Sequence, residues 1–230
     1  MSRAPHYLYE TELGLDGAVF ETAGQYVLRS ESLFPFYEEI ESPDQLRESK
    51  EVIRDLKAID WAFTNDDTRF LTHDLHPYPA KFIPQLPGHV IARLSLRGEL
   101  VFDPFGGCGT SALEAVRLGR RALSTDANAV ATLIGKVKTC NLDRSAATDI
   151  HAIRCALATG LIELPKPDVL CSNYSRHIPN IPNVDKWFPF TSRGELALIK
   201  SRVEAMDSEK AKDIALLALS RIVLAVSFQD

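Results

Sequence analysis

The chain has 230 residues, 45% of them hydrophobic and 25% charged, which is typical of a globular protein with a sizeable core. Its net charge of −5 argues against this chain alone gripping a DNA backbone, because neutralising phosphates requires clustered lysines and arginines. We find no signal-like N-terminus and no apolar run long enough to cross a membrane, so we expect a cytoplasmic protein without a membrane partner.

The four cysteines show neither Cys-x-x-Cys pairs nor metal-like spacing with the histidines. We therefore interpret them as reduced thiols and predict no metal site. They are Cys108, Cys140, Cys155 and Cys171.

Residues 1–41 hold scattered aromatic side chains without a clean period, and we interpret them as an arm that packs on its own domain or on a partner. Segments such as Gly24–Leu28 could pair as strands. A helix is predicted from Ser42 to about Ala58, because Pro43 stands at the first helical position and Ser42 and Gln45 form a capping box.

The stretch from Asp60 to His76 is predicted to be a loop. His73, Asp74 and His76 lie close enough in sequence to suggest a metal, but without a third ligand pattern we interpret them as polar groups that line or close a pocket. Prolines then stiffen the segment that ends at Pro84. The apolar spacing after it predicts a helix, with Leu86, Val90, Ile91 and Leu94 on one face.

A short apolar run, Leu100–Phe102, predicts a strand that ends at Asp103. A loop with three glycines follows, and Thr110 begins a helical pattern. Strand, glycine loop and helix in this order form the entrance of a doubly wound α/β sheet, where small cofactors bind. Glycines there let the backbone approach a ligand that any Cβ atom would push away.

Both phosphate-binding motifs fit this loop poorly. A P-loop needs a lysine before its Ser/Thr, and none lies between Gly106 and Thr110. A dinucleotide fingerprint needs a third glycine after Gly107 and Gly109, where Ser111 and Ala112 stand instead. The carboxylate of Asp103 would repel a pyrophosphate but suits a cationic or amine-bearing ligand.

A second strand is predicted over Arg121–Thr125, with Asp126 at its tip. An acidic side chain there grips a ribose diol in this type of sheet. Two carboxylates without a phosphate anchor favour S-adenosylmethionine over NAD or ATP. Asn128 is predicted to cap the next helix, which carries Val130, Leu133, Ile134 and Val137.

The run Asp103-Pro-Phe-Gly-Gly-Cys-Gly-Thr110 resembles the cofactor motif Asp-Pro-Phe-x-Gly-x-Gly-Thr of DNA amino-methyltransferases. His76-Pro-Tyr-Pro-Ala-Lys-Phe-Ile-Pro84 resembles the segment that these enzymes place before the strand, over the methionine end of the cofactor. The resemblance covers roughly Trp61 to Thr139. It implies a Rossmann-like class I methyltransferase fold that binds S-adenosyl-L-methionine through Asp103, Pro104, Phe105, Gly106, Gly107, Cys108, Gly109, Thr110, Asp126, Ala127, Asn128, His76, Tyr78, Ala80, Lys81 and Phe82.

Within this resemblance, Asp103 is expected near the methionine amine and Asp126 on the ribose. Gly106 to Gly109 would clear room for the ligand, while Phe105 and Ala127 would contact the sulfur side and the adenine. His76 and Lys81 are expected at the mouth of the pocket. The family's catalytic residues have no matching positions here, as described below.

Downstream, a helix is predicted from about Ser145, and Asp168–Cys171 is strand-like and could supply a third strand. The long loop of residues 173–189 suits either nucleic acid or packing on the protein, since it mixes Arg176, His177, Lys186 and Trp187. Ser192 and Glu195 predict a capped helix. Residues 207–228 form a helix that is apolar nearly all round and must be covered on most sides.

We divide the chain into an N-terminal arm and helix (1–60), a cofactor-binding α/β core (61–143) and a helical and loop extension (144–230) that we expect to face a partner or DNA. The family also needs a catalytic (Asp/Asn/Ser)-Pro-Pro-(Tyr/Phe/Trp) loop, and the sequence has no Pro-Pro pair. Its nearest counterpart, Ser172-Asn-Tyr-Ser175, lacks both prolines.

Few strands can be identified, so we expect an incomplete sheet that a second chain completes, together with the catalytic loop. The sequence thus predicts the cofactor-binding half of a split DNA N6-adenine or N4-cytosine methyltransferase of restriction-modification or phage defence, with DNA contacted through the complex. An N-terminal piece of a longer enzyme also fits. Part of a tRNA or rRNA methyltransferase and a catalytically inactive cofactor-binding subunit are the alternative functions.

Overall fold

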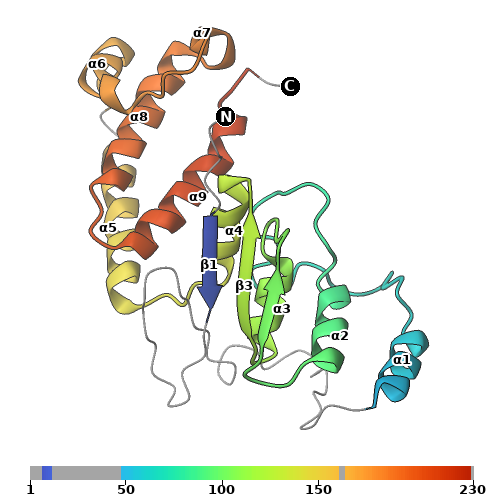
Figure 1. The fold of residues 1–230 in the computed structure, drawn as a ribbon. Helices are drawn as coiled ribbons and strands as arrows, with labels where there is room; N and C mark the ends of the chain where they lie inside the picture. Colours follow the sequence, from blue (N-terminus) through green and yellow to red (C-terminus); the bar gives the residue numbers. More distant parts are fainter. Residues whose placement is uncertain (1–6, 12–47, 161–163, 229–230) are drawn as a thin grey trace, which may run out of the picture. The chain divides into compact units, whose positions relative to one another are not determined.

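The computed structural model describes residues 7–11, 48–160 and 164–228. The chain forms two compact units, Met1–Asn141 and Leu142–Asp230 (Figure 1). Strands occur in the first unit, whereas the described part of the second is helical. The glycine loop and both acidic strand tips lie in the first unit.

The first unit holds the helices α1 (Ser49–Ala58) and α2 (Gln85–Leu94) ahead of its parallel strands. The predicted end of the first helix near Ala58 and the predicted second helix are both confirmed, but α1 begins later than its sequence suggests. Glu48 has a non-helical ψ of 139° and acts as the N-cap, and its carbonyl accepts a hydrogen bond from the amide of Val52 at 3.2 Å. The predicted capping box at Ser42 lies outside the described residues, as does Gly24–Leu28.

The sheet has three strands in the order β1–β3–β2. The predicted strands are confirmed as β2 (Leu100–Asp103) and β3 (Arg121–Asp126), which pair in parallel with Asp103 opposite Ser124. Strand β1 (Tyr7–Thr11) pairs antiparallel with β3 on its other side. This strand was not predicted, and it means that β3, rather than the glycine-loop strand β2, is central in the described sheet.

Three helices cover one face of this sheet. They are α2, α3 (Thr110–Arg117) and α4 (Ala129–Lys138), and α3 packs between the other two. Side chains from α2, α3 and β3 form the core, together with Val101 of β2. The core residues are Ile91, Ala92, Ala112, Leu113, Ala115, Val116, Leu118 and Ala122.

The alternation of side chains along β2 leaves its second face open. Val101 packs against the core, whereas Leu100 and Phe102 point the other way and are 46% and 56% exposed. A doubly wound fold covers both sheet faces with helices. The described unit is thus a mixed α/β sheet with helices on one face, compatible with a methyltransferase fold.

Arg120, in the turn between α3 and β3, is fully buried and holds the end of α2. Its Nε donates to Ser95 Oγ at 3.0 Å and its guanidinium to the carbonyl oxygens of Leu118 at 2.6 Å and of Ser95. These carbonyls follow the last turn of α2 and of α3, where the helix itself supplies no donors.

We expect Arg120→Met to lower the free energy of unfolding by about 2–4 kcal/mol, because buried carbonyls would lose their donors. Thermal and urea unfolding followed by circular dichroism would measure this. The exposed Arg97 is the control, since Arg97→Met should stay within about 0.5 kcal/mol. Equal stability of the two variants would contradict the role of Arg120.

The second unit consists of α5 (Arg144–Gly160), α6 (Pro167–Asn173), the 3₁₀ turn η1 (Ser175–His177), α7 (Val184–Trp187), α8 (Phe190–Glu204) and α9 (Glu209–Ala225). Helix α8 packs against α6 and α9, and α9 also packs against α5. The predicted helices near Ser145 and Asp207 are confirmed. Ser208 caps α9 by accepting a hydrogen bond from the amide of Ala211 at 3.3 Å.

Two predictions for this unit are wrong. Asp168–Cys171 is not a third strand but part of α6, because Pro167 occupies the first helical turn, where its missing N–H costs nothing. Leu170 is then buried in the unit's interior and contacts the position of Gly194 in α8. The predicted box at Ser192 does not open a helix, because α8 begins at Phe190 with Pro189 as N-cap.

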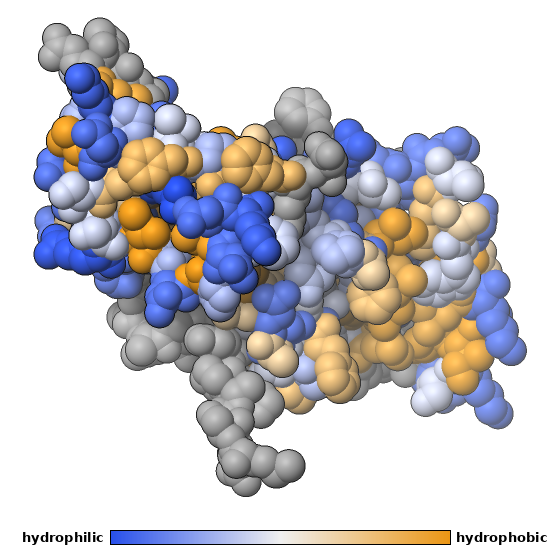
Figure 2. Space-filling model, turned by 90° about the horizontal axis from the view of Figure 1, so that it is seen from above, coloured by the Kyte–Doolittle hydropathy of each residue, from blue (hydrophilic) through white to orange (hydrophobic). Residues whose placement is uncertain are grey.

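The apolar helix α9 keeps exposed side chains near its end, where Leu224 is 60% exposed. Seen from above, the surface mixes apolar and hydrophilic side chains (Figure 2). None of the described helices has the length and apolar character needed to cross a membrane.

Candidate cofactor site at the glycine loop

The glycine loop between β2 and α3 folds back onto the neighbouring strand. The amide of Gly106 donates to the carbonyl of Thr125 at 2.9 Å, and the amide of Gly109 donates to the carbonyl of Gly106 at 2.8 Å. Gly107 and Gly109 have φ angles of 51° and 76°. A side chain at either position would be strained, so the sequence folds this way because glycine is there.

Gly106 makes the closest approach of the loop to the sheet. A Cβ atom on this residue would lie 1.6 Å from Ser124 Oγ, far inside van der Waals contact. Ser124 is buried on β3, and its hydroxyl has no hydrogen-bond partner within the described part of the chain. The hydroxyl therefore borders the space that a larger residue at position 106 would need.

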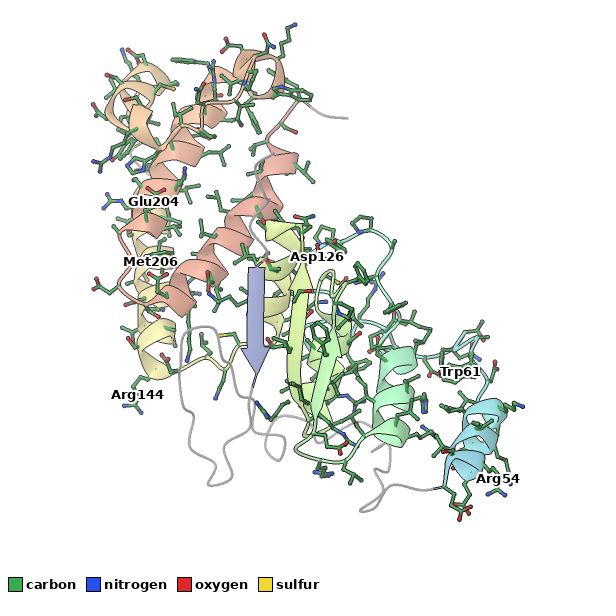
Figure 3. All side chains as sticks on the ribbon, viewed as in Figure 1. Arg54, Trp61, Asp126, Arg144, Glu204 and Met206 are labelled. Atoms are coloured by element: carbon green, nitrogen blue, oxygen red, sulfur yellow. The ribbon has the colours of Figure 1, made fainter. Side chains whose placement is uncertain are left out.

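Asp126, at the tip of β3, ties the glycine loop to the next helix (Figure 3). Its Oδ2 accepts the amide hydrogen of Gly107 at 2.9 Å, and its Oδ1 accepts that of Asn128 at 2.8 Å. Asn128 in turn caps α4 by accepting from the amide of Val130 at 2.9 Å, as predicted. Sequence patterns gave no indication of this bracing role, because it depends on the loop folding back toward β3.

Asp103 and its neighbours shape the other side of the loop. The carboxylate of Asp103 accepts the amide hydrogen of Phe105 at 3.1 Å, and Thr125 Oγ1 donates to the carbonyl of Pro104 at 2.8 Å. Phe105 is 88% exposed. Ala127 is exposed as well, so these two side chains are open to a ligand at the carboxyl ends of the strands.

Tyr78 is the residue of the upstream segment that the structure brings to the loop. Its ring lies 3.5 Å from where a Cβ atom of Gly107 would be. Burial, and secondly the charge of Asp126, raise the pKa of Tyr78, and the polar side chain of Asn128 partly opposes this. Tyr78 thus remains a neutral hydrogen-bonding group over the loop.

The other predicted residues of this segment either bond within the segment or are exposed. Lys81 donates through Nζ to the carbonyl of His73 at 3.0 Å, while His76 is buried with its Nδ1 2.8 Å from the carbonyl of Pro77. Ala80 and Phe82 are both exposed. Within the described ranges, no cluster of His, Cys, Asp or Glu could hold a metal ion.

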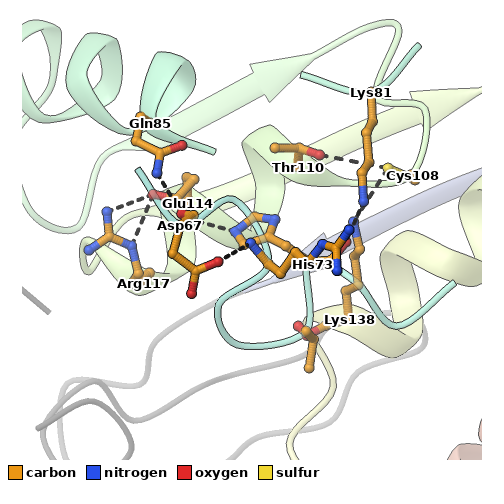
Figure 4. Close-up of polar contacts among 11 residues, drawn as sticks. Asp67, His73, Lys81, Gln85, Cys108, Thr110, Glu114, Arg117 and Lys138 are labelled. Atoms are coloured by element: carbon orange, nitrogen blue, oxygen red, sulfur yellow. Dashed lines mark hydrogen bonds and ion pairs between the residues drawn. The ribbon is translucent and has the colours of Figure 1, made fainter. Parts of the chain in front are cut away.

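Sequence reasoning missed a group of buried polar side chains behind the loop (Figure 4). His73 Nε2 lies 2.9 Å from Glu114 Oε1, and Arg117 donates to Glu114 Oε2 from Nε at 2.9 Å and from a terminal nitrogen at 2.6 Å. Lys138 Nζ donates to Cys108 Sγ at 3.3 Å. One signal was available: Glu114 is a charge within the apolar run of α3.

Burial dominates the titration of these groups. It lowers the pKa of His73, and the bond to Glu114 only partly opposes this. Burial also lowers the pKa of Lys138, against the opposing influence of Cys108. His73 Nδ1 is buried and has no partner in the described structure, so a second proton on the ring would be left without an acceptor.

His73 is therefore expected to make folding sensitive to acid. The folded-state pKa of His73 lies below the ordinary value of about 6.5. The stability that the neutral ring contributes is therefore complete above about pH 6.5, and it is lost as the pH falls from there through the folded-state pKa. Glu114, Arg117 and Lys138 surround the ring and set this balance.

The measurement is the urea dependence of unfolding between pH 7.5 and 5. The unaltered chain should lose up to about 1.4 kcal/mol per pH unit more than His73→Gln, which cannot titrate. Parallel pH profiles of the two proteins would show that His73 does not titrate in this range.

A known protein family matches the part of the chain that carries this site. Residues 27–136, which include the glycine loop and both acidic strand tips, match the DNA methylase family of the N6/N4 type. This part of the chain is similar to DNA methylases of the N6/N4 type. The family uses S-adenosylmethionine as its methyl donor, so the predicted family and cofactor are confirmed.

Two curated methylases resemble the chain. The Type II methyltransferase M.MvaI of Kocuria varians is 29% identical over 171 residues, which are 72% of this chain and 36% of that protein. The Type II methyltransferase M.MjaII of Methanocaldococcus jannaschii is 36% identical over 66 residues, which are 29% of this chain and 12% of that protein. The chain thus spans only a minor part of either relative's length. No solved structure matches it.

Proposed function

We propose that this chain is the S-adenosylmethionine-binding half of a split DNA N6-adenine or N4-cytosine methyltransferase, acting in restriction-modification or phage defence. The observation that carries the proposal is the pair of carboxylates, Asp103 and Asp126, at the carboxyl ends of adjacent parallel strands. They flank a loop held close to the sheet by glycine. Such a site suits a ligand with an ammonium group and a ribose but without phosphate.

The donor set fits S-adenosylmethionine. Asp103 would receive the methionine ammonium, and Asp126 the ribose, since each of its oxygens has a second lone pair beyond the backbone bond it already accepts. Phe105 and Ala127 would contact the sulfur side and the adenine. Tyr78 would cover the ligand from the side of Gly107.

The remaining predicted contacts are proposed for the same site. Backbone groups of the glycine loop would line the methionine end, and the upstream segment would close it. These residues are Pro104, Gly106, Cys108, Gly109, Thr110, Asn128, His76, Ala80, Lys81 and Phe82. When bound, the cofactor supplies the methyl group, and these residues of the chain bind and orient it.

We propose that a second chain supplies the catalytic loop. The sequence has no Pro-Pro pair, and Ser172–Ser175 runs from the end of α6 into η1 instead of following a strand. In the described sheet β2, the strand that ends at Asp103, is an edge strand. It pairs with β3 on one side and with no described strand on the other. A strand added to this edge would satisfy its backbone groups.

The test is titration calorimetry of S-adenosylmethionine into the full chain, followed by transfer of a labelled methyl group to DNA. We expect binding by the chain alone, and transfer only after addition of a protein from the adjacent reading frame with a Pro-Pro-Tyr-type motif. Transfer by the chain alone would overturn the split arrangement. Failure to bind the cofactor would overturn the proposed site.

A catalytically inactive cofactor-binding subunit is the second candidate, and the missing catalytic tetrapeptide favours it. The same assay separates the two, because a complex that binds cofactor without transferring methyl groups to DNA or RNA would have lost catalysis. Transfer to RNA in place of DNA would instead identify part of an RNA methyltransferase.

A further inference from the structure

A buried carboxylate lies directly behind the glycine loop and is fully paired. Glu114 lies in α3, the helix that follows the loop, and has no exposed surface. One of its oxygens faces His73 Nε2, which is 2.9 Å away, and the other accepts two hydrogen bonds from Arg117. Arg117 also stacks over the ring of Phe70, with its guanidinium carbon 5.8 Å from the ring centroid.

Burying these charged groups is expensive, and an apolar core of the same volume would be at least as stable. What a paired carboxylate provides, and an apolar contact does not, is a directional bond that fixes one partner. Here the partner is His73, a residue of the upstream segment. Its side chain is 2% exposed, and its Nε2 faces the carboxylate.

The same segment makes two further hydrogen bonds, one to the end of α4 and one within itself. Thr72 Oγ1 donates to the carbonyl of Lys138 at 2.9 Å, and the carbonyl of His73 accepts from Lys81 Nζ at 3.0 Å. Between His73 and Lys81 lies Tyr78, whose ring covers Gly107. His73 thus lies at the start of the stretch that runs over the loop, and Lys81 lies at its end (Figure 4).

We propose that His73 and Glu114 are positioning residues for the cofactor: their bond holds the segment of residues 72–81 in the place from which Tyr78 covers the glycine loop. Neither side chain touches the cofactor itself. This inference rests on the proposed function, because it assumes that S-adenosylmethionine binds at the glycine loop.

Two substitutions of His73 separate a positioning role from the mere filling of space by its side chain. His73→Leu keeps an apolar volume but removes the donor, and we expect it to raise the Kd for S-adenosylmethionine about tenfold by calorimetry. His73→Gln keeps an amide nitrogen near the place of Nε2, so its Kd should stay within about threefold of the unaltered chain. A merely structural role would not predict this rescue.

Val116→Ala is the matched control. Val116 is 1% exposed in the same helix but packs into the apolar core. We expect it to lower the unfolding temperature while leaving the Kd of the folded protein unchanged. Hydrogen exchange without cofactor gives the second readout: the amides of residues 72–81 should exchange faster in His73→Leu and remain protected in Val116→Ala.

The outcomes are distinguishable. If the unaltered chain binds no S-adenosylmethionine, the proposed function fails, and the positioning role fails with it. If the unaltered chain binds but His73→Leu has the same Kd, or if Val116→Ala weakens binding and loosens residues 72–81 equally, only the positioning role is overturned. A tenfold loss in His73→Leu, rescued in His73→Gln, supports it.

Discussion

Gly106→Ala is expected to abolish measurable S-adenosylmethionine binding while the rest of the domain folds. The new Cβ atom would lie 1.6 Å from Ser124 Oγ and 3.0 Å from Ser124 Cβ; rotation of the hydroxyl relieves only the first contact, so the loop must also shift away from β3. That movement would break the bond between the Gly106 amide and the Thr125 carbonyl and pull the loop from its place between the two carboxylates. Calorimetry would measure the Kd, and circular dichroism would report folding.

A second substitution tests whether the clash is the cause. Ser124→Gly removes both atoms nearest the new Cβ, so Gly106→Ala with Ser124→Gly should regain part of the lost affinity. Ser124→Gly alone should bind nearly as the unaltered chain does, apart from a modest loss of strand stability. If the double variant binds no better than Gly106→Ala, the loss has another origin.

Asp126→Ala is expected to raise the Kd for S-adenosylmethionine about 100-fold. It removes the proposed ribose acceptor and also leaves the amides of Gly107 and Asn128 without their carboxylate partner. Hydrogen bonds to charged groups contribute about 1.5–3 kcal/mol each, and about 1.4 kcal/mol is a tenfold change. Asp126→Asn keeps one acceptor oxygen, so its Kd should lie between those of the unaltered chain and Asp126→Ala. Calorimetry on the full chain measures all three proteins.

Asp143 provides a matched control for the loss of a helix-capping aspartate. Its Oδ1 accepts the amide hydrogen of Ala146 at 2.8 Å and its Oδ2 pairs with Lys210 Nζ at 3.0 Å, both within the second unit. Asp143→Ala should therefore lower stability without changing the Kd. Unchanged cofactor affinity in Asp126→Ala, or an equal loss in Asp143→Ala, would contradict the assignment of Asp126.

Sequence alone predicted the parts of the site that depend on neighbours along the chain. The strand ends at Asp103 and Asp126, the start of α3 at Thr110 and the cap at Asn128 are confirmed because turn chemistry and capping are local. The run Val-Leu-Cys after Asp168 misled, since a short apolar run suits a strand or a buried helix equally.

Long-range features escaped prediction. Strand β1 carries no strict alternation of apolar and polar residues, and its place is set by pairing with β3. The bond between His73 and Glu114 joins a loop to a helix, and Arg120 reaches the end of a helix earlier in the chain. Such contacts exist only once the fold brings the elements together, and no local spacing encodes them.

The pairing of β1 with β3 has a consequence for how the protein is made. Tyr7 lies opposite Asp126, so strand β1 finds its partner only after α1, α2, β2 and α3 have been synthesised. Closing so long a loop is slow, because its entropy is lost before the new contacts repay it. During synthesis β1 must therefore wait, and β3 emerges beside β2 before its second neighbour can join.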